Sequence, residues 1–192
     1  KTSLLQCVMG LLPIQSGEIR FGGENLNRQI AERRAPMGIG YVPQGRQIFP
    51  MLTVEENLRI GLPARKEKRS QIPDFIFELF PVLQEMLTRR GGDLSGGQQL
   101  QLAIGRALVI DPQLLILDEP TEGIQPNIVH EIGDIILRLN QEIGLTVLLV
   151  EQKLPFARKV ADRFCILDRG RNVAAGEMNE LDEETIRKYL TV

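Results

Sequence analysis

The stretch LLILDEP at residues 114–120 is the strongest guide to the fold of this chain. Its four consecutive apolar residues are typical of a strand buried on both faces of a parallel sheet. They bring two adjacent carboxylates, Asp118 and Glu119, to the carboxyl end of that strand, where ligands of open α/β sheets bind. In phosphoryl transfer, one carboxylate stands beside Mg²⁺ and another positions or deprotonates the attacking water. Asp118 and Glu119 suit these two roles, although an acidic turn that only ends a buried strand would have the same sequence.

The stretch LSGGQQ at residues 94–99 opens a predicted helix with apolar residues at positions 100, 102, 103 and 108. A helix N-terminus offers unpaired N–H groups and the positive end of the helix dipole, and two glycines remove side chains that would keep a phosphate away. The Ser95 hydroxyl adds another donor. Ser95 and Gln98 can also form a capping box for their own helix. Both interpretations can hold together, because the backbone donors stay available.

Short runs rich in Val, Ile and Leu alternate along the chain with stretches of helical period. This pattern predicts an α/β fold with a mostly parallel sheet covered by helices. Candidate buried strands lie at residues 38–42, 114–117, 146–150 and 164–167. Two runs flanked by glycine, residues 18–21 and 172–175, resemble edge hairpins. Further helices are predicted to begin near Pro126 and to cover residues 155–163.

The segment between Pro43 and Ser95 has a different character, because it contains no buried-strand run. We predict that residues 45–95 form a helical subdomain inserted in the α/β core of a single domain spanning residues 1–192. TVEE at residues 53–56 is a capping-box signal for its first helix. A second helix is predicted over residues 73–87, where six apolar residues recur at helical spacing.

The composition is that of an ordinary globular domain, with 192 residues, 43% hydrophobic and 25% charged. A formal net charge of -2 gives no basic excess that would indicate nucleic acid as the main partner. The apolar runs are far shorter than the ~20 residues of a membrane-spanning helix. Cys7 and Cys165 are predicted to be reduced, packed thiols of a cytoplasmic protein. The only histidine, His130, is predicted to lie at the surface rather than to bind a metal.

The chain opens with KTS at residues 1–3, which matches the last residues of the phosphate-loop pattern G-x-x-x-x-G-K-[ST] before a helix. So short a match carries little weight alone. Its place ahead of Gln44, LSGGQQ and the two carboxylates predicts that it is the tail of a phosphate loop truncated by the start of the chain. Lys1 would then face the β- and γ-phosphates, and Thr2 would ligate Mg²⁺. Without the preceding glycine loop, most backbone donors for the phosphates are absent, so we expect this fragment to bind ATP poorly.

The order KTS, YVPQ, LSGGQQ, LLILDEPT resembles the ATP-binding-cassette (ABC) proteins over the whole chain. The distance from Gln44 to Ser95 fits the helical subdomain of the transporter branch, and no coiled coil interrupts the domain as in the repair and chromosome-type ATPases. VPQGRQIFP, LTVEENL and TEGIQPNIV are similar to the importers of branched-chain amino acids and urea. Gln44 followed by GRQIFP favours the second ATPase subunit of the urea, or short-chain amide, uptake system.

The resemblance implies an ATPase that works as a pair of such subunits with ATP held between them. The residues it assigns to one side of a nucleotide are Lys1, Thr2, Ser3, Gln44, Asp118 and Glu119. The residues that would reach across to the other subunit's ATP are Ser95, Gly96, Gly97 and Gln98. The implied Mg²⁺ ligands are Thr2, Gln44 and Asp118, and the implied catalytic residues are Glu119, Gln44 and Gln152.

The resemblance also implies partners and a location. The partners are integral membrane permease subunits, a second ATPase subunit and, indirectly, a solute-binding protein, with no nucleic acid. The protein would sit at the cytoplasmic face of the membrane and power the uptake of urea or short-chain amides. The open alternatives are an ATPase for branched-chain amino acid import, a weakly hydrolysing nucleotide-binding subunit, and a non-transport ABC ATPase.

Two features depart from the usual pattern of the resembled family. After the carboxylates that pattern continues S-A-L-D, whereas residues 122–125 are EGIQ, so Gln125 replaces the usual aspartate. At the end of the TVLLVE strand the usual histidine is Gln152, which can hydrogen-bond a γ-phosphate but cannot become an imidazolium. Because Glu119 is retained, we expect hydrolysis, slower or dependent on a heterodimer partner that supplies the histidine.

Overall fold

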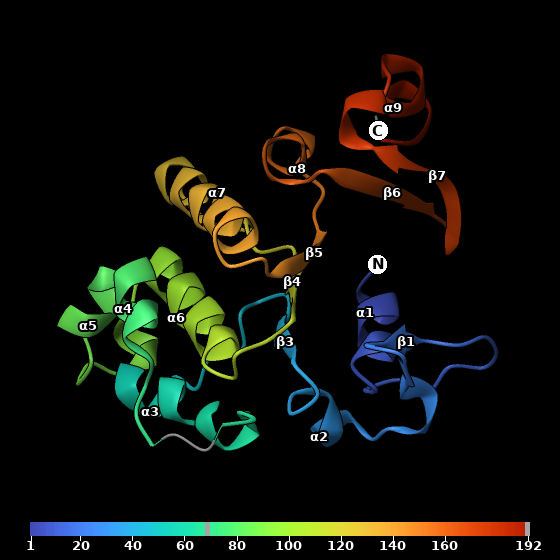
Figure 1. Cartoon of the computed structure of the whole chain (residues 1–192). Coiled ribbons are helices and arrows are strands. Elements are labelled where there is room, and N and C mark those ends of the chain that lie inside the picture. The colour runs from blue at the N-terminus through green and yellow to red at the C-terminus, as the bar shows by residue number, and fades with distance from the viewer. Residues whose placement is uncertain (68–69, 191–192) are drawn as a thin grey trace.

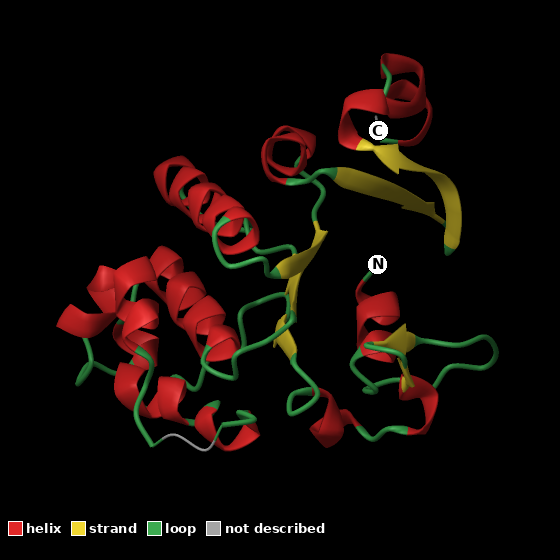
Figure 2. Ribbon diagram, in the orientation of Figure 1, coloured by secondary structure: helices red, strands yellow, loops and turns green. Residues whose placement is uncertain are grey.

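A parallel sheet forms the centre of the computed structural model, which describes residues 1–67 and 70–190. Its strands run in the order β3 (Ile39–Val42), β4 (Leu114–Asp118) and β5 (Thr146–Val150). Both pairings are parallel, with Tyr41 opposite Ile116 and Asp118 opposite Val150. Helices cover both faces of this sheet (Figures 1 and 2). The predicted α/β class with a parallel sheet is confirmed.

The apolar run of β4 is buried on both faces, as predicted. Leu115 and Leu117 point into the larger core, whereas Ile116 points into a second, smaller core. This alternation follows from the two-residue period of a strand. The larger core lies against α6 (Gly96–Leu108) and α7 (Pro126–Gln141), and the smaller one contains Leu5 of α1 (Thr2–Val8). Figure 1 shows α1 on one side of the sheet and α6 on the other.

The start of the chain is held in place by Arg34, at the end of α2 (Ala31–Arg34). This side chain is only 3% exposed, and its guanidinium donates to the backbone carbonyl oxygens of Cys7, Val8, Leu26 and Gln29. Two of these acceptors lie at the C-terminal end of α1, where helix carbonyls lack intrahelical partners. Burial lowers the pKa of the guanidinium. Arg34 therefore fixes α1, whose N-terminal end carries Lys1 and Thr2.

Between β3 and α6 the regular elements of the described residues are helices, joined by loops. The elements are α3 (Val54–Arg59), the 3-10 helix η2 (Leu62–Ala64), α4 (Asp74–Leu79), α5 (Pro81–Glu85) and the 3-10 helix η3 (Gly91–Asp93). The prediction of a single helix over residues 73–87 is wrong. It breaks at Phe80, which has a non-helical backbone conformation, because Pro81 lacks an N–H and disfavours a helical residue before it. The boundaries 45–95 of a separate subdomain stay a prediction.

The capping box predicted at residues 53–56 is confirmed. The Glu56 N–H donates to the Thr53 hydroxyl oxygen at 3.1 Å, and the Thr53 N–H donates to a Glu56 carboxylate oxygen at 2.8 Å. The hydrogen bonds that the Thr53 N–H and hydroxyl donate to the Glu56 carboxylate lower the pKa of Glu56. They fix the start of α3, whose Val54 and Leu58 are fully buried in the larger core.

We expect Thr53→Ala to lower the free energy of unfolding by about 1 kcal/mol, because the first turn of α3 loses its side-chain acceptor. Urea denaturation of the purified protein measures this loss. Thr53→Ser keeps the hydroxyl, so its free energy of unfolding is expected to lie within about 0.5 kcal/mol of the wild-type value. Equal losses in the two variants would contradict the assignment of the effect to the cap.

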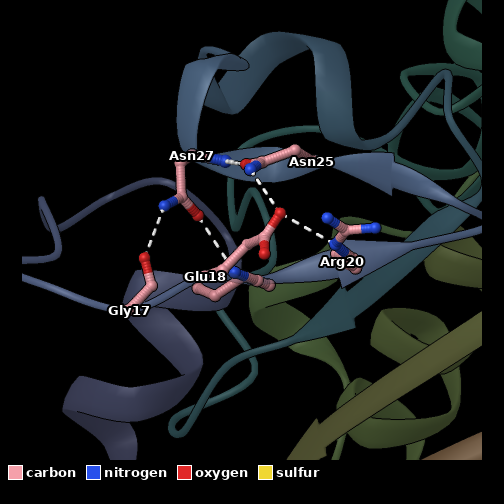
Figure 3. A network of polar contacts seen from close by, with 6 residues as sticks. Gly17, Glu18, Arg20, Asn25 and Asn27 are labelled. Atoms are coloured by element: carbon pink, nitrogen blue, oxygen red, sulfur yellow. Dashed lines mark hydrogen bonds and ion pairs between the residues drawn. The ribbon is translucent and has the colours of Figure 1, made fainter.

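A small antiparallel hairpin, β1 (Arg20–Phe21) with β2 (Glu24–Asn25), lies beside α1. Figure 3 shows the polar network that holds it. One Glu18 oxygen accepts from the Asn25 amide at 2.7 Å and from Arg20 Nε at 2.8 Å. Asn27, in the following 3-10 helix η1 (Leu26–Arg28), donates to the Gly17 carbonyl oxygen and accepts from the Ile19 N–H. The hairpin predicted at residues 18–21 is confirmed.

The C-terminal part differs from expectation in two ways. The predicted buried strand at residues 164–167 belongs to β6 (Arg163–Asp168), which pairs antiparallel with β7 (Arg171–Glu177) and buries only Ile166. The helix predicted over residues 155–163 is α8 (Leu154–Val160), which ends before the strand begins. Cys165 is exposed rather than packed, and Cys7 is half-buried; both are free thiols. The chain continues through the 3-10 helix η4 (Met178–Glu180) to α9 (Glu183–Tyr189).

Candidate functional site

The carboxylate of Asp118 is the most buried charged group at the edge of the sheet. Asp118 ends β4, is 0% exposed, and neither of its carboxylate oxygens has a hydrogen-bond partner. Burial raises its pKa, while the nearby Thr2 hydroxyl and the charges of Lys1 oppose this rise. Thr2 lies close without completing a hydrogen bond to either oxygen. A buried carboxylate with free oxygens, beside a threonine hydroxyl, is a donor set that fits a hard cation such as Mg²⁺.

The raised pKa of Asp118 has a consequence for stability. In the folded protein this carboxyl holds its proton to a higher pH than in the unfolded chain, so its charge destabilises the fold above the folded pKa and costs nothing below the unfolded one. We therefore expect Asp118→Asn to increase the free energy of unfolding near pH 7.5 in the presence of EDTA. The gain should shrink as the pH falls toward the ordinary aspartate range. Urea denaturation at several pH values, with the exposed Asp168→Asn as control, checks this; a gain independent of pH would contradict it.

Glu119 leaves the strand in an unusual backbone conformation. Its φ is +49°, in the left-handed region, and its N–H donates to the Val150 carbonyl oxygen at 2.8 Å. Residues other than glycine rarely adopt this backbone conformation, and those that do are concentrated at functional sites. The turn sends the Glu119 side chain away from the core to the edge of the sheet, where it is half-buried.

Two amide side chains converge on the Glu119 carboxylate. Gln152, which follows β5, donates through Nε2 to Glu119 Oε1 at 2.6 Å. Gln44, which follows β3, donates through Nε2 to Glu119 Oε2 at 3.5 Å and to Glu122 Oε2 at 3.0 Å. The three predicted catalytic residues thus come from the carboxyl ends of three adjacent parallel strands. Asp118 precedes Glu119 in the chain, so a group that could bind a metal and one that could accept a proton lie side by side.

A second set of contacts, which no local sequence pattern indicates, fixes Gln152. Glu151 Oε1 accepts from the backbone N–H groups of Gln152 at 2.8 Å and Lys153 at 3.0 Å. Its other oxygen accepts from the hydroxyl of the fully buried Thr121 at 2.7 Å, and Lys153 Nζ donates to the Thr121 carbonyl oxygen at 2.9 Å. The loops after β4 and β5 are thereby joined. The only hint of these contacts in the sequence is that β4 and β5 are each followed by polar residues.

The loop after Gln44 is attached to α6. Arg106, on α6, donates through Nη2 to the Gln47 carbonyl oxygen at 2.8 Å, and its guanidinium lies 5.1 Å from the centre of the Phe49 ring. Burial lowers the pKa of Arg106. Arg46 and Gln47 both have positive φ angles, so this loop is tightly folded. A cavity of about 220 Å³ lies between this loop and the loop after β4, lined by Val42, Pro43, Gly45, Arg46, Leu100, Glu119, Pro120 and Glu122.

LSGGQQ opens α6 as predicted, with Ser95 as the N-cap. The Ser95 hydroxyl oxygen accepts from the Gln98 N–H at 3.4 Å, and Gln98 Oε1 accepts from the Ser95 N–H at 2.9 Å. The capping-box interpretation is therefore confirmed. Gly97 has a further constraint, since a Cβ there would lie 3.0 Å from Ile128 on α7.

The structure does not bring all the predicted nucleotide-binding residues together. Lys1 is the N-cap of α1, followed by Thr2 and Ser3, and α1 lies across the sheet from α6 (Figure 1). Gln125 is the exposed N-cap of α7 and makes no side-chain capping bond. His130 is exposed as predicted, with Nδ1 2.6 Å from Lys159 Nζ. Among residues 1–67 and 70–190, no group of three or more His, Cys, Asp or Glu side chains could hold a metal, whereas Mg²⁺ at nucleotide sites uses one or two carboxylates with phosphates.

Parallel strands that end in a buried aspartate, a glutamate and two converging amides are the arrangement expected of a nucleotide-binding ATPase of the α/β class. The sequence profile of the ABC transporter family matches residues 1–122. The chain is 44% identical over 174 residues to the high-affinity branched-chain amino acid transport ATP-binding protein BraG of Pseudomonas aeruginosa, covering 90% of this chain and 74% of that protein. It is 38% identical over 184 residues to the probable branched-chain amino acid transport ATP-binding protein LivF of Archaeoglobus fulgidus, covering 95% and 78%.

Among solved structures, the ADP conformation of MJ1267, an ATP-binding cassette of an ABC transporter, matches with a TM-score of 0.79 and 28% identity. The match covers 99% of this chain and 79% of that one. The chain belongs to the ABC transporter family. It is an ATP-binding subunit of that family, and such cassettes are ATP-hydrolysing transport ATPases. In the part of the chain that the structure describes, no helix has the length and apolar character needed to span a membrane.

Proposed function

We propose that this chain is the ATPase subunit of an importer for branched-chain amino acids. The observation that carries the hydrolytic part is the convergence of Gln44 and Gln152 on Glu119, one residue from the buried Asp118. In this proposal Glu119 accepts a proton from the water that attacks the γ-phosphate. Gln152 holds the carboxylate of Glu119 at 2.6 Å and offers an amide to the phosphate. Gln44 would contact the metal and the attacking water.

In this proposal Asp118, Thr2 and Gln44 would hold Mg²⁺. The support is the pair of Asp118 oxygens that are buried without partners, and the Thr2 hydroxyl near them. The ion would neutralise charge on the phosphate oxygens of the nucleotide. Lys1 and Ser3, at the exposed start of α1, would hold the phosphates.

The arrangement of the two nucleotide-binding regions supports a pair of subunits. Because α1 and α6 lie on opposite sides of the sheet, we propose that Ser95, Gly96, Gly97 and Gln98 serve ATP bound mainly by the other subunit. Gln152 in place of a histidine supports a heterodimer whose other subunit carries that histidine. If this chain hydrolysed ATP as a homodimer at the full rate of a transporter, the proposal of a heterodimer would be contradicted.

The surface around the loop after Gln44 supports contact with a membrane partner. Phe49 is 45% exposed and Met51 is 71% exposed, and both belong to residues 45–95, which we propose as an inserted helical subdomain. Large exposed apolar side chains that lie close together mark interaction sites. We propose that this surface binds the permease subunits, which places the protein peripherally at the cytoplasmic face of the membrane, with a solute-binding protein acting indirectly.

The proposal about the transported solute has different support from the proposal about hydrolysis. The 44% and 38% identities to BraG and LivF, both named for branched-chain amino acid transport, favour those amino acids. Gln44 followed by GRQIFP favours urea or short-chain amides as a second candidate. The ATPase does not contact the solute in either case, so the partner subunits decide between them.

Purification from membranes with the bound permease subunits, followed by reconstitution in liposomes, tests this function. Leucine, valine or isoleucine, added with the co-purified binding protein, is expected to stimulate ATP hydrolysis and to be taken up. Stimulation by urea or acetamide alone would favour the second candidate over the first. Recovery of soluble partners alone, with no permease, would contradict the transport function. The matched control is the same complex carrying Glu119→Gln, which should bind the partners without hydrolysis.

A further inference from the structure

We infer that Glu122 is a positioning residue that fixes the amide orientation of Gln44, so that the Gln44 oxygen is presented to the metal and water. The inference rests on the proposed function of Gln44. It concerns the second carboxylate of the loop after β4. Glu122 is exposed and lies outside the larger core, so its contact with Gln44 does not serve packing.

The contact between Gln44 and Glu122 is the shorter of the two that Gln44 makes with carboxylates. Gln44 Nε2 lies 3.0 Å from Glu122 Oε2 and 3.5 Å from Glu119 Oε2. The first distance is typical of an N–H···O hydrogen bond, whereas the second is near the limit. Glu122 is therefore the main partner that holds the Gln44 amide.

The chemistry of the two acceptors decides which way the amide faces. An ionised carboxylate can only accept hydrogen bonds, whereas the glutamine amide has an NH₂ group that donates and an oxygen that accepts. Rotation of the amide by 180° would place its oxygen against two carboxylates. The NH₂ group must therefore face Glu122 and Glu119. The Gln44 oxygen is then left free for a cation or a water hydrogen.

Glu122 is itself held in place by the backbone around it. Its N–H donates to the Glu119 carbonyl oxygen at 3.2 Å, and its carbonyl oxygen accepts from Arg46 Nη2 at 3.2 Å. Gly123 follows with a φ of +65°, which a residue with a side chain would adopt only with strain. Arg46 also donates to Gln99 Oε1 on α6 at 3.4 Å. The Glu122 carboxylate is thus preorganised, and a serine at this position would be two carbon atoms too short to replace it.

The test is a double-mutant cycle between Glu122 and Gln44, measured in the permease complex. We expect Glu122→Ala to lower kcat about tenfold and to raise the Mg²⁺ concentration for half-maximal hydrolysis by a similar factor. The KM for ATP should stay within about twofold of the wild-type value, because the substitution removes no contact that binds the nucleotide equally in the ground state and the transition state. Glu122→Gln keeps an acceptor oxygen and should recover most of the loss. The exposed Glu85→Ala, on α5, is the control and should match the wild type.

The decisive comparison uses the Gln44→Ala background, where Glu122→Ala is expected to have no further effect on the Mg²⁺ requirement. The same tenfold effect in both backgrounds would overturn the inference. A second measurement does not depend on turnover. It measures by electron paramagnetic resonance how tightly Mn²⁺ binds to the ATP-loaded Glu119→Gln complex, with and without Glu122→Ala. Unchanged Mn²⁺ affinity would overturn the inference, whereas absence of hydrolysis in the wild type would overturn the proposed function instead.

Discussion

Glu119→Gln is expected to lower kcat for ATP hydrolysis about 10²- to 10⁴-fold, the range that a general base contributes. The substitution keeps the size of the side chain and removes its ability to accept a proton. It also replaces an acceptor-only carboxylate by an amide, so one of the donor contacts from Gln44 and Gln152 is weakened. Asp118, which we propose as the metal ligand, is untouched. ATP binding should therefore match that of the wild type, whereas turnover is lost.

Single-turnover measurements with excess enzyme separate chemistry from binding and product release. The control is Glu142→Gln, an exposed glutamate just after α7 that is remote from the carboxyl ends of the strands. Equal rates of ATP hydrolysis in the wild type and Glu119→Gln would contradict the hydrolytic role of Glu119. They would favour the alternative in which this chain binds nucleotide and its partner subunit hydrolyses it.

Phe80→Ala is expected to cost roughly 3–5 kcal/mol of the free energy of unfolding. Phe80 is 0% exposed, lies between α4 and α5, and belongs to the larger core together with Leu58, Ile76 and Leu83. These neighbours are fixed by their own helices and cannot collapse into the space left by the ring. For a domain of this size, the loss corresponds to a decrease in Tm of about 10 °C.

Thermal and urea denaturation measure this loss. The matched control is Phe77→Ala on α4, where the ring is only half-buried and the cost should be clearly smaller. Similar costs at the two positions would contradict the central place of Phe80 in the core. Because the same core contains Leu100 and Ile104 of α6, Phe80→Ala should also loosen the helix that LSGGQQ opens.

Local sequence patterns were a good guide to the elements that bear the site. LLILDEP predicted a buried strand that ends in Asp118 and Glu119, since unbroken apolar runs and strand-end ligands are local properties. TVEE and LSGGQQ predicted two helix starts, because a capping box is complete within four residues. The prediction failed where a local break or a missing neighbour decided the outcome. Pro81 divides an otherwise regular helical stripe, and β6 pairs with β7 instead of entering the parallel sheet.

The residues that hold the site in position were not predictable in the same way. Glu151 and Thr121 lie 30 positions apart, and nothing in either local sequence indicates that their side chains meet at 2.7 Å. Arg106 reaches back 59 positions to the loop after Gln44. Such contacts depend on which strands are neighbours and on how far each loop extends. Neither property is written in a pattern of a few residues.

The sequence by itself determined the class of this protein, the carboxyl-end position of Asp118 and Glu119, and the helix start at Ser95. Those features depend on periodicity and capping, which act within one strand or one helical turn. Tertiary structure alone decided that Gln44 and Gln152 converge on Glu119, that Asp118 is left buried with free oxygens, and that Glu122 holds the Gln44 amide. The physical reason is that parallel strand order brings distant loops to one edge, where burial and charge act between residues 33 to 78 positions apart.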